Sequence, residues 1–135
     1  MFRFERLDIW NEAISFARKM YACTRTFPQI EVFALADQLR RATVSISANI
    51  AEGSGSSSSK DFRNYLNISI KSIYEVVSLL AIAKNNEYIS EREFQDLREE
   101  AERLTKRTRA FRNSLSRDSI LQAPSSKLYA LSSTP

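Results

Sequence analysis

The residues of this chain that could do chemistry are mostly charged side chains, and their order is clearest between residues 91 and 117. Six carboxylates lie between Glu91 and Glu102, and six bases follow between Arg103 and Arg117 with no acid among them. Clustered lysine and arginine side chains bind phosphate oxygens through charge, without reading base sequence. One chemistry that this stretch offers is therefore the binding of a polyanion.

Patterns for catalysis or metal binding are weak. The chain has no histidine, which removes the commonest general base and metal ligand. Cys23 is the only cysteine, and we expect a small buried hydrophobe there. Two glycines cannot form a P-loop or a dinucleotide loop. Ser57 to Lys60 matches Ser-x-x-Lys, but a serine run before any lysine does so by chance. We expect a protein that is not an enzyme and needs no metal or cofactor.

A second polar set lies along an apolar stripe between residues 35 and 53. Leu35, Leu39, Ala42, Ile46 and Ile50 fall on one face of a helix, which the pattern predicts to end at Gly53. An amphipathic helix does not need so many polar side chains close to its stripe. The polar members are Gln38, Arg40, Arg41, Ser45, Asn49 and Glu52.

The elements that would position these residues are four long helices. We expect them from Asp8 to about Thr26, from 30–33 to Glu52, from Ser59 to about Asn86, and from Ser90 to about Arg117. Phe27-Pro28 ends the first helix, Gly53 to Ser58 form a turn, and Ser90 with Glu93 is a capping box. The predicted fold is all-α, an antiparallel up-down-up-down four-helix bundle over residues 1–117. Residues 118–135 are expected to be a poorly ordered tail containing serine and proline.

Regular apolar seams support the last two helices. They comprise Phe62, Leu66, Ser69, Ile73, Val76, Leu80 and Ala83, then Phe94, Leu97, Ala101, Leu104, Thr108, Phe111 and Leu115. The first helix has a seam of Trp10, Ala13, Ala17, Met20, Thr24 and Phe27, which Ile9, Phe16 and Tyr21 widen. The third helix carries further apolar residues on both flanks: Tyr65, Ile68, Leu79 and Ile82 on one, and Ile70, Tyr74 and Val77 on the other. Such a helix is either central in its bundle or shared with another subunit.

Composition bounds the compartment and the partners. The net charge is +4 and the pI is near 9.4, which is compatible with nucleic acid without being diagnostic of it. No stretch approaches the roughly 20 apolar residues of a membrane span, and no signal peptide is recognisable. We therefore expect a cytoplasmic protein that does not enter a membrane.

Antiparallel packing should sort the charges to the two ends of the bundle. Acids at helix starts and bases at helix ends also complement the helix dipoles, which is the simpler explanation. The functional alternative is a cationic end that follows phosphates, reinforced if the chain forms a ring. The candidate nucleic-acid-binding residues are Arg3, Arg6, Lys60, Arg63, Arg103, Lys106, Arg109, Arg112 and Arg117.

Several motifs resemble those of one protein family. They are Phe27-Pro28, Gln38 to Ala42, Ser45-Ile46, Asn49 to Gly53, and Glu75. The chain looks like the four-helix-bundle proteins encoded by intervening sequences in bacterial large-subunit ribosomal RNA genes. More distantly it is similar to the accessory variability protein of diversity-generating retroelements, which works with a reverse transcriptase. The resemblance covers roughly residues 5 to 115.

This resemblance implies a ring-shaped homo-oligomer, with a pentamer favoured, and a role in binding nucleic acid. It provides no catalytic residues to carry over. Two positions depart from the family pattern. Ser47 stands where a proline often follows Ser-Ile, and Lys71-Ser72 replaces a Gly-Ser pair. A lysine there would disturb a close helix contact unless it points outward.

The signature residues allow two interpretations. Arg40 or Arg41 could pair with Glu75, fixing helix register or a subunit contact. Asn49 and Glu52 could cap backbone or bridge to a neighbouring subunit. Alternatively, the set contacts a ligand directly. Its members are Gln38, Arg40, Arg41, Asn49, Glu52 and Glu75.

Three functional hypotheses follow. The leading one is a non-enzymatic ring that binds nucleic acid, RNA favoured, through its basic end. The alternative is a protein-interaction adaptor that docks a partner enzyme such as a reverse transcriptase. A purely structural assembly is the third.

Overall fold

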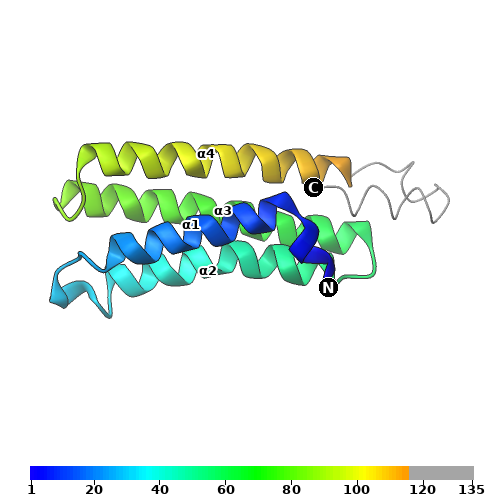
Figure 1. The fold of residues 1–135 in the computed structure, drawn as a ribbon, viewed down its shortest axis with the longest axis horizontal. Coiled ribbons are helices and arrows are strands. Elements are labelled where there is room, and N and C mark those ends of the chain that lie inside the picture. Colours follow the sequence, from blue (N-terminus) through cyan, green and yellow to red (C-terminus); the bar gives the residue numbers. More distant parts are fainter. Residues whose placement is uncertain (116–135) are drawn as a thin grey trace.

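Four antiparallel helices make up the described part of the chain, residues 1–115, in a computed structural model (Figure 1). The all-α, up-down-up-down bundle is thereby confirmed. The predicted tail, 118–135, lies outside the described residues. The elements follow in the order η1 (Arg3–Arg6), α1 (Asp8–Thr24), η2 (Gln29–Glu31), α2 (Leu35–Ser54), α3 (Ser59–Asn85) and α4 (Glu91–Ser114).

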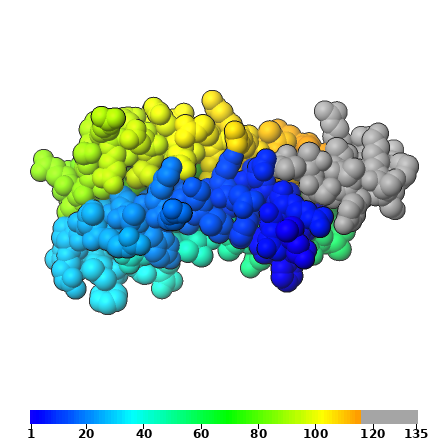
Figure 2. Space-filling view, viewed as in Figure 1, coloured from blue at the N-terminus to red at the C-terminus, as the bar shows by residue number. Residues whose placement is uncertain are grey.

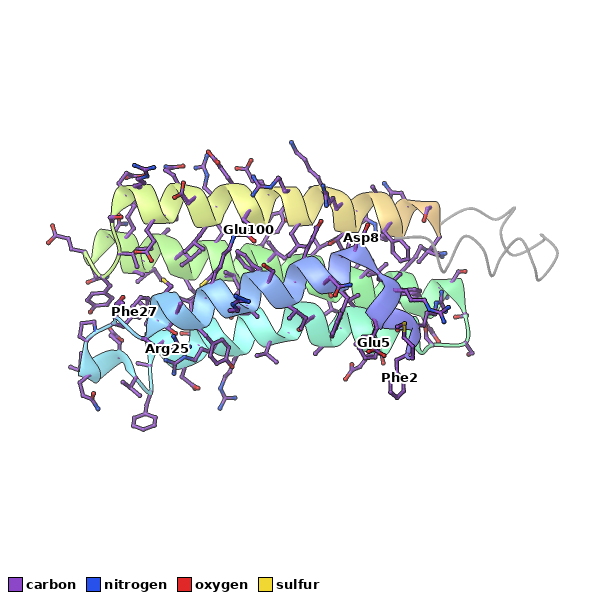
Figure 3. The ribbon with its side chains drawn as sticks, in the orientation of Figure 1. Phe2, Glu5, Asp8, Arg25, Phe27 and Glu100 are labelled. Atoms are coloured by element: carbon purple, nitrogen blue, oxygen red, sulfur yellow. The ribbon has the colours of Figure 1, made fainter. Side chains whose placement is uncertain are left out.

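The helices pack around the bundle in chain order. α2 and α3 form the most extensive pair, α1 packs on α2, α4 packs on α3, and α1 meets α4 to close the bundle. In the space-filling view α1 and the N-terminal segment cross the front between α4 and α2 (Figure 2). Lys19 of α1 bonds Glu100 of α4 at 2.8 Å (Figure 3). The shared core therefore runs the length of all four helices.

Apolar periodicity places the core as expected in α3 and α4. All seven residues of each predicted seam are buried. In α1 the buried stripe is instead centred on Ile9, Ala13, Phe16, Met20 and Cys23, with Trp10 and Ala17 only half-buried. Four of the six predicted seam residues, Ala13, Met20, Thr24 and Phe27, are thus buried, and the larger Phe16 fills the core in place of Ala17.

Helix ends follow the caps where a cap is present. The Ser90 hydroxyl accepts from the Glu93 amide at 3.0 Å, and the Ser58 hydroxyl accepts from the Asp61 amide at 3.1 Å. α2 begins at Leu35, later than predicted. The 3₁₀ turn η2 takes up the preceding residues, and the Glu31 carboxylate accepts from the Leu35 amide at 3.3 Å.

Gly53 lies inside α2 rather than beyond its end, which corrects the sequence prediction. The helix continues to Ser54. A Cβ at Gly53 would lie 2.7 Å from Tyr65 Cβ and 2.8 Å from Phe62 Cδ1, closer than real carbon contacts allow. Glycine is required here because the C-terminal turn of α2 packs directly on the aromatic residues of α3.

α3 is long and apolar enough to span a membrane, judged by length and composition alone. Its most apolar window has a mean hydropathy of 1.5, and half of that window is buried inside the bundle. The sequence expectation that no stretch qualifies is therefore corrected. A core helix passes the same test because it buries residues around most of its circumference.

Candidate nucleic-acid interface

Arg3 holds the N-terminal segment on the end of α2. Its Nη1 donates to the Ser54 carbonyl oxygen at 3.1 Å, and its guanidinium lies 5.1 Å from the centre of the Phe62 ring. Beside it the Phe4 ring packs on Trp10 with centroids 4.8 Å apart. Arg3 therefore satisfies a carbonyl at the C-terminus of α2, where a cation also complements the helix dipole.

Arg63 does the same for α4. From the first turns of α3, its Nη1 donates to the Leu115 carbonyl oxygen at 2.7 Å, and the side chain is half-buried. Two of the predicted phosphate-binding arginines thus have structural partners. The positions of Arg3 and Arg63 are therefore explained by their bonds to carbonyl groups at helix C-termini, without a phosphate ligand.

Other predicted cations face solvent. Arg6, Lys60, Arg103 and Lys106 are exposed and form no hydrogen bond or ion pair with another described residue. Arg117 lies outside the described part of the chain. Arg103 and Lys106 sit near the middle of α4, so the available positive charge lies along the side of the bundle as well as at its end.

Charge separation between the two ends is less complete than the sequence analysis predicted. The basic end also carries Glu5, Glu52 and Asp61, and the other end carries Arg25 and Lys84. Figure 3 places Glu5 and Arg25 at opposite ends of the bundle. The tip of the bundle therefore offers a mixed field, and a stretch without acids must be sought elsewhere.

A groove between α3 and α4 gathers cations without a comparable number of acids. It consists of two adjoining hollows of about 670 and 440 Å³ that share Tyr74 and Arg109 as lining residues. We call it the α3–α4 groove. Its lining comprises Asn67, Ile70, Lys71, Ile73, Tyr74, Val77 and Ser78 of α3, and Arg98, Ala101, Glu102, Thr105, Lys106, Arg109 and Arg112 of α4.

Tyr74 and Arg109 form the partition between the two hollows. Arg109 Nη2 donates to the Tyr74 hydroxyl at 2.6 Å, and the guanidinium carbon lies 5.6 Å from the ring centre. The tyrosine is 56% exposed. Arg112 lies further along, donating to Asn67 Oδ1 at 2.9 Å. These bonds orient the guanidinium groups and leave part of their surface in the groove.

Five cations and one carboxylate line this groove. The carboxylate, Glu102, is already engaged with Arg98 at 3.5 Å. Sequence analysis found Lys106, Arg109 and Arg112 but missed Lys71, Arg98 and Tyr74. Antiparallel register of α3 and α4 was the signal that would have placed Tyr74 opposite Arg109.

Neither signature arginine pairs with Glu75 among residues 1–115, so Glu75 does not fix the register of α2 and α3 through them. A pairing of these residues between subunits stays a prediction. Arg41 Nε donates to Asp37 Oδ2 at 2.9 Å, one turn back on the same helix. Arg40 Nε donates to Thr24 Oγ1 at 2.9 Å, with its guanidinium 5.7 Å from the Tyr21 ring centre. Both arginines therefore bond to partners on α1 and α2 and not to Glu75 of α3.

The remaining signature residues divide into two groups. Asn49 Nδ2 donates to the Ser45 carbonyl and hydroxyl oxygens at 2.8 and 3.0 Å, and the Ser72 hydroxyl donates to Ser45 Oγ at 2.8 Å. These bonds tie α2 to α3. Gln38, Glu52 and Glu75 are exposed. The structure therefore does not bring the six signature residues into one network.

The two positions that depart from the family pattern are readily accommodated. α2 runs through Ser47 without interruption. Lys71 is exposed and lines the α3–α4 groove, so it points outward as the sequence analysis required.

Titratable groups with shifted pKa values lie at the other end of the bundle. Burial, followed by the nearby Glu93 carboxylate, raises the pKa of Cys23 to about 12. The hydrogen bond that Tyr88 donates to Glu31 at 2.8 Å raises the pKa of this phenol. A thiol held in its protonated form is a poor nucleophile, so Cys23 is not an activated cysteine.

Comparison with known proteins identifies the family. The family model described as 23S rRNA-intervening sequence protein matches residues 5–110. The chain belongs to this family. The resemblance seen in the sequence motifs is thereby confirmed. No curated protein matches the chain.

A solved structure has the same fold. It is a protein of unknown function from the S23 ribosomal protein family of Bacteroides thetaiotaomicron VPI-5482. The two share 24% sequence identity with a TM-score of 0.72, covering 77% of this chain and 97% of the other. This likeness supports the four-helix architecture.

Proposed function

We propose that this 23S rRNA-intervening sequence protein is a non-enzymatic nucleic-acid-binding protein, with RNA favoured by the family's genetic setting. One observation carries the proposal. From Arg103 to Ser114, α4 carries cations and no acid, and its exposed Arg103 and Lys106 have no partner among residues 1–115. The binding surface is the second half of α4 together with the α3–α4 groove.

This surface differs from the tip of the bundle favoured by the sequence. Arg3 and Arg63 are engaged with helix-end carbonyls, and acids share the tip. Phosphate binding through the side of α4 uses Arg103 and Lys106, which form no hydrogen bond or ion pair with another residue of 1–115. Binding of this kind depends strongly on salt and weakly on base sequence.

Assembly into a homo-oligomeric ring, with five subunits as the resemblance implies, forms part of the proposal. Val44 of α2 and Ile68 of α3 are each 45% exposed. The Ser45–Ser72 hydrogen bond joins the two helices that carry them. Exposed apolar residues on this pair of helices fit contact with a second copy of the chain, and a ring would repeat each basic surface around its circumference.

Fluorescence anisotropy tests the proposal. The probes are a structured ribosomal RNA fragment, duplex DNA and a random single strand, each at low and near-physiological salt. We expect micromolar or tighter binding. Arg103→Glu with Lys106→Glu should weaken it at least tenfold, because two phosphate contacts become repulsive, and should lower the slope of log K against log salt.

The matched control is Arg25→Glu with Arg92→Glu. It makes the same change in net charge with two exposed arginines at the other end of the bundle. The control should bind as the unmodified chain does at every salt concentration. Equal losses of affinity in both variants would show that the effect depends on net charge and not on the position of the cations. Absence of binding at low salt would refute the proposal.

A specific observation favours a second function, docking of a protein partner. In the α1–α2 connection Ile30 is 82% exposed and Phe33 is 91% exposed. Two large apolar side chains so fully exposed in one short connection are available to a protein partner. If the adaptor function holds, Ile30→Ser with Phe33→Ser should abolish partner capture and leave nucleic-acid affinity unchanged.

A further inference from the structure

The α3–α4 groove combines features that a phosphate-binding surface alone does not need. Phosphate oxygens need only exposed cations, whereas this groove also holds an exposed aromatic ring. Tyr74 lines both hollows, so its ring stands between two open spaces. A ligand of this groove would have to complement both an exposed aromatic ring and the surrounding cations.

The exposed apolar surface of the groove is contributed more by an aromatic ring and side-chain stems than by pockets lined with aliphatic side chains. Ile73 and Ala101, which form its floor, are each only 1% exposed. Exposed apolar area is supplied by the Tyr74 ring, half-buried Val77 and the stems of the long cationic side chains. An amphipathic helix needs aliphatic pockets for its side chains, and the floor leaves little such area uncovered. A planar ligand suits the ring better.

The charge of the lining residues favours one sign of ligand charge. Five cations and one engaged carboxylate favour an anionic ligand. The lining runs from Arg98 to Arg112 on α4, about 21 Å at 1.5 Å per residue. This length accommodates a chain of several phosphates. A polymer with both negative charge and planar groups is a nucleic acid.

We infer that the α3–α4 groove is a single-strand site, in which an unpaired nucleobase stacks on Tyr74 while Lys106, Arg109 and Arg112 hold the flanking phosphates. Stacking on an exposed aromatic ring accepts any base, because every base has a π face. Paired bases cannot reach the ring without leaving the duplex stack. The inference rests on the proposed function and deepens it, by naming unpaired strands as its target.

Arg109 contributes in two ways at this site. Its bond to the Tyr74 hydroxyl fixes the ring, and its guanidinium remains within the groove as a phosphate ligand or a second stacking surface. Tyr74→Phe keeps the ring and removes that bond. Tyr74→Ala removes both, so the two variants separate stacking from hydrogen bonding.

An abasic oligonucleotide separates base stacking from phosphate binding. The affinity of the full chain is measured by anisotropy for a short single strand and for its abasic counterpart of equal length and charge. We expect the intact strand to bind about 5- to 150-fold more tightly, the range that one stacked base produces. Tyr74→Ala should remove this preference and leave the abasic affinity unchanged, while Tyr74→Phe should retain most of it.

The matched control variant is Tyr21→Ala. Tyr21 is also an exposed tyrosine beside an arginine, Arg40, but it lies on α1 and lines neither hollow of the groove. Its removal should leave the preference for the intact strand unchanged. Thermal melting of all three variants checks that each is folded.

The outcomes separate this inference from the proposed function. If both strands bind equally, or if Tyr74→Ala keeps the preference, the stacking site is refuted while phosphate binding stands. If neither strand binds at low salt, both proposals fail. An acidic helical peptide that binds more tightly than the intact strand, and depends on Tyr74, would assign the groove to a protein and overturn the inference.

Discussion

Cys23 shows how a single residue reports its surroundings. The thiol is 3% exposed, and burial with the Glu93 carboxylate nearby raises its pKa from 9.0 to about 12. Between these two values the unfolded chain loses the thiol proton and the folded chain keeps it. Cys23 therefore stabilises the fold below pH 9, and this contribution is lost as the pH rises from 9 towards 12.

We predict that the unmodified chain loses more stability than Cys23→Ala over this alkaline interval. Lysine and tyrosine titration affects both chains alike, so the difference between them isolates the thiol. Urea unfolding at pH 8, 9.5 and 11 measures it. Parallel curves for the two chains would show that the thiol ionises as easily in the fold as in water.

Individual site residues were only partly predictable from the sequence. The acid-free stretch of α4 is visible in the sequence because charge signs need no geometry. The partners of Arg3 and Arg63 were not predictable, since both bond carbonyls more than 50 positions away. Tyr74 was seen only as one flank of an apolar helix. Its relation to Arg109 depends on the register between α3 and α4.

At the scale of elements, the close approach of α2 and α3 depends on one missing side chain. Gly53→Ala would place a Cβ 2.7 Å from Tyr65 Cβ. Overpacking of this kind costs about 1–3 kcal/mol, against a gain of about 1 kcal/mol in helix propensity. We predict a net loss of stability and a fall of several degrees in Tm, measured by circular dichroism.

The neighbouring glycine is the control for this prediction. A Cβ at Gly55 would meet the Glu52 carbonyl oxygen at 3.5 Å, an ordinary contact. Gly55→Ala should change stability by less than about 0.5 kcal/mol. A Tm for Gly53→Ala as high as that of Gly55→Ala would mean that the aromatic side chains of α3 move aside without cost.

The elements themselves were largely predictable, and the reasons are physical. Seams in α3 and α4 repeat over six turns, so periodicity fixes the buried face. Ser90 marks the start of α4 by its cap. The start of α2 was missed because no side-chain cap precedes it and a 3₁₀ turn takes its place. Gly53 was mistaken for a terminator because a tight contact and a helix end both favour glycine.

At the scale of the whole molecule, the proposed ring requires an apolar face to be covered. Ile68 of α3 and Ile14 of α1 are 45% and 42% exposed, and their two helices lie diagonally opposite in the bundle. We predict that Ile68→Lys lowers the assembled mass, because it places a charge in the proposed subunit contact. Ile14→Lys should leave the mass unchanged. Sedimentation velocity measures both.

Three outcomes would contradict this prediction. If Ile14→Lys alone dissociates the assembly, the contact uses α1. If neither variant changes the mass, the contact lies on some other face. If the unmodified chain is a monomer, there is no ring, and the electrostatic fields of several basic surfaces do not add. Sequence reasoning could not decide among these results, because exposed apolar residues appear on several faces.

The packing of Phe4 on Trp10 makes the protein its own optical probe. Trp10 is the chain's one tryptophan, half-buried at the junction of η1 and α1. Its emission will report on the docking of the N-terminal segment. The α3–α4 groove is lined by other elements, so changes there should leave the spectrum alone. The Trp10 emission spectrum of each unlabelled groove variant therefore shows whether its N-terminal segment is still docked, and it can be recorded on the same samples as the binding measurements.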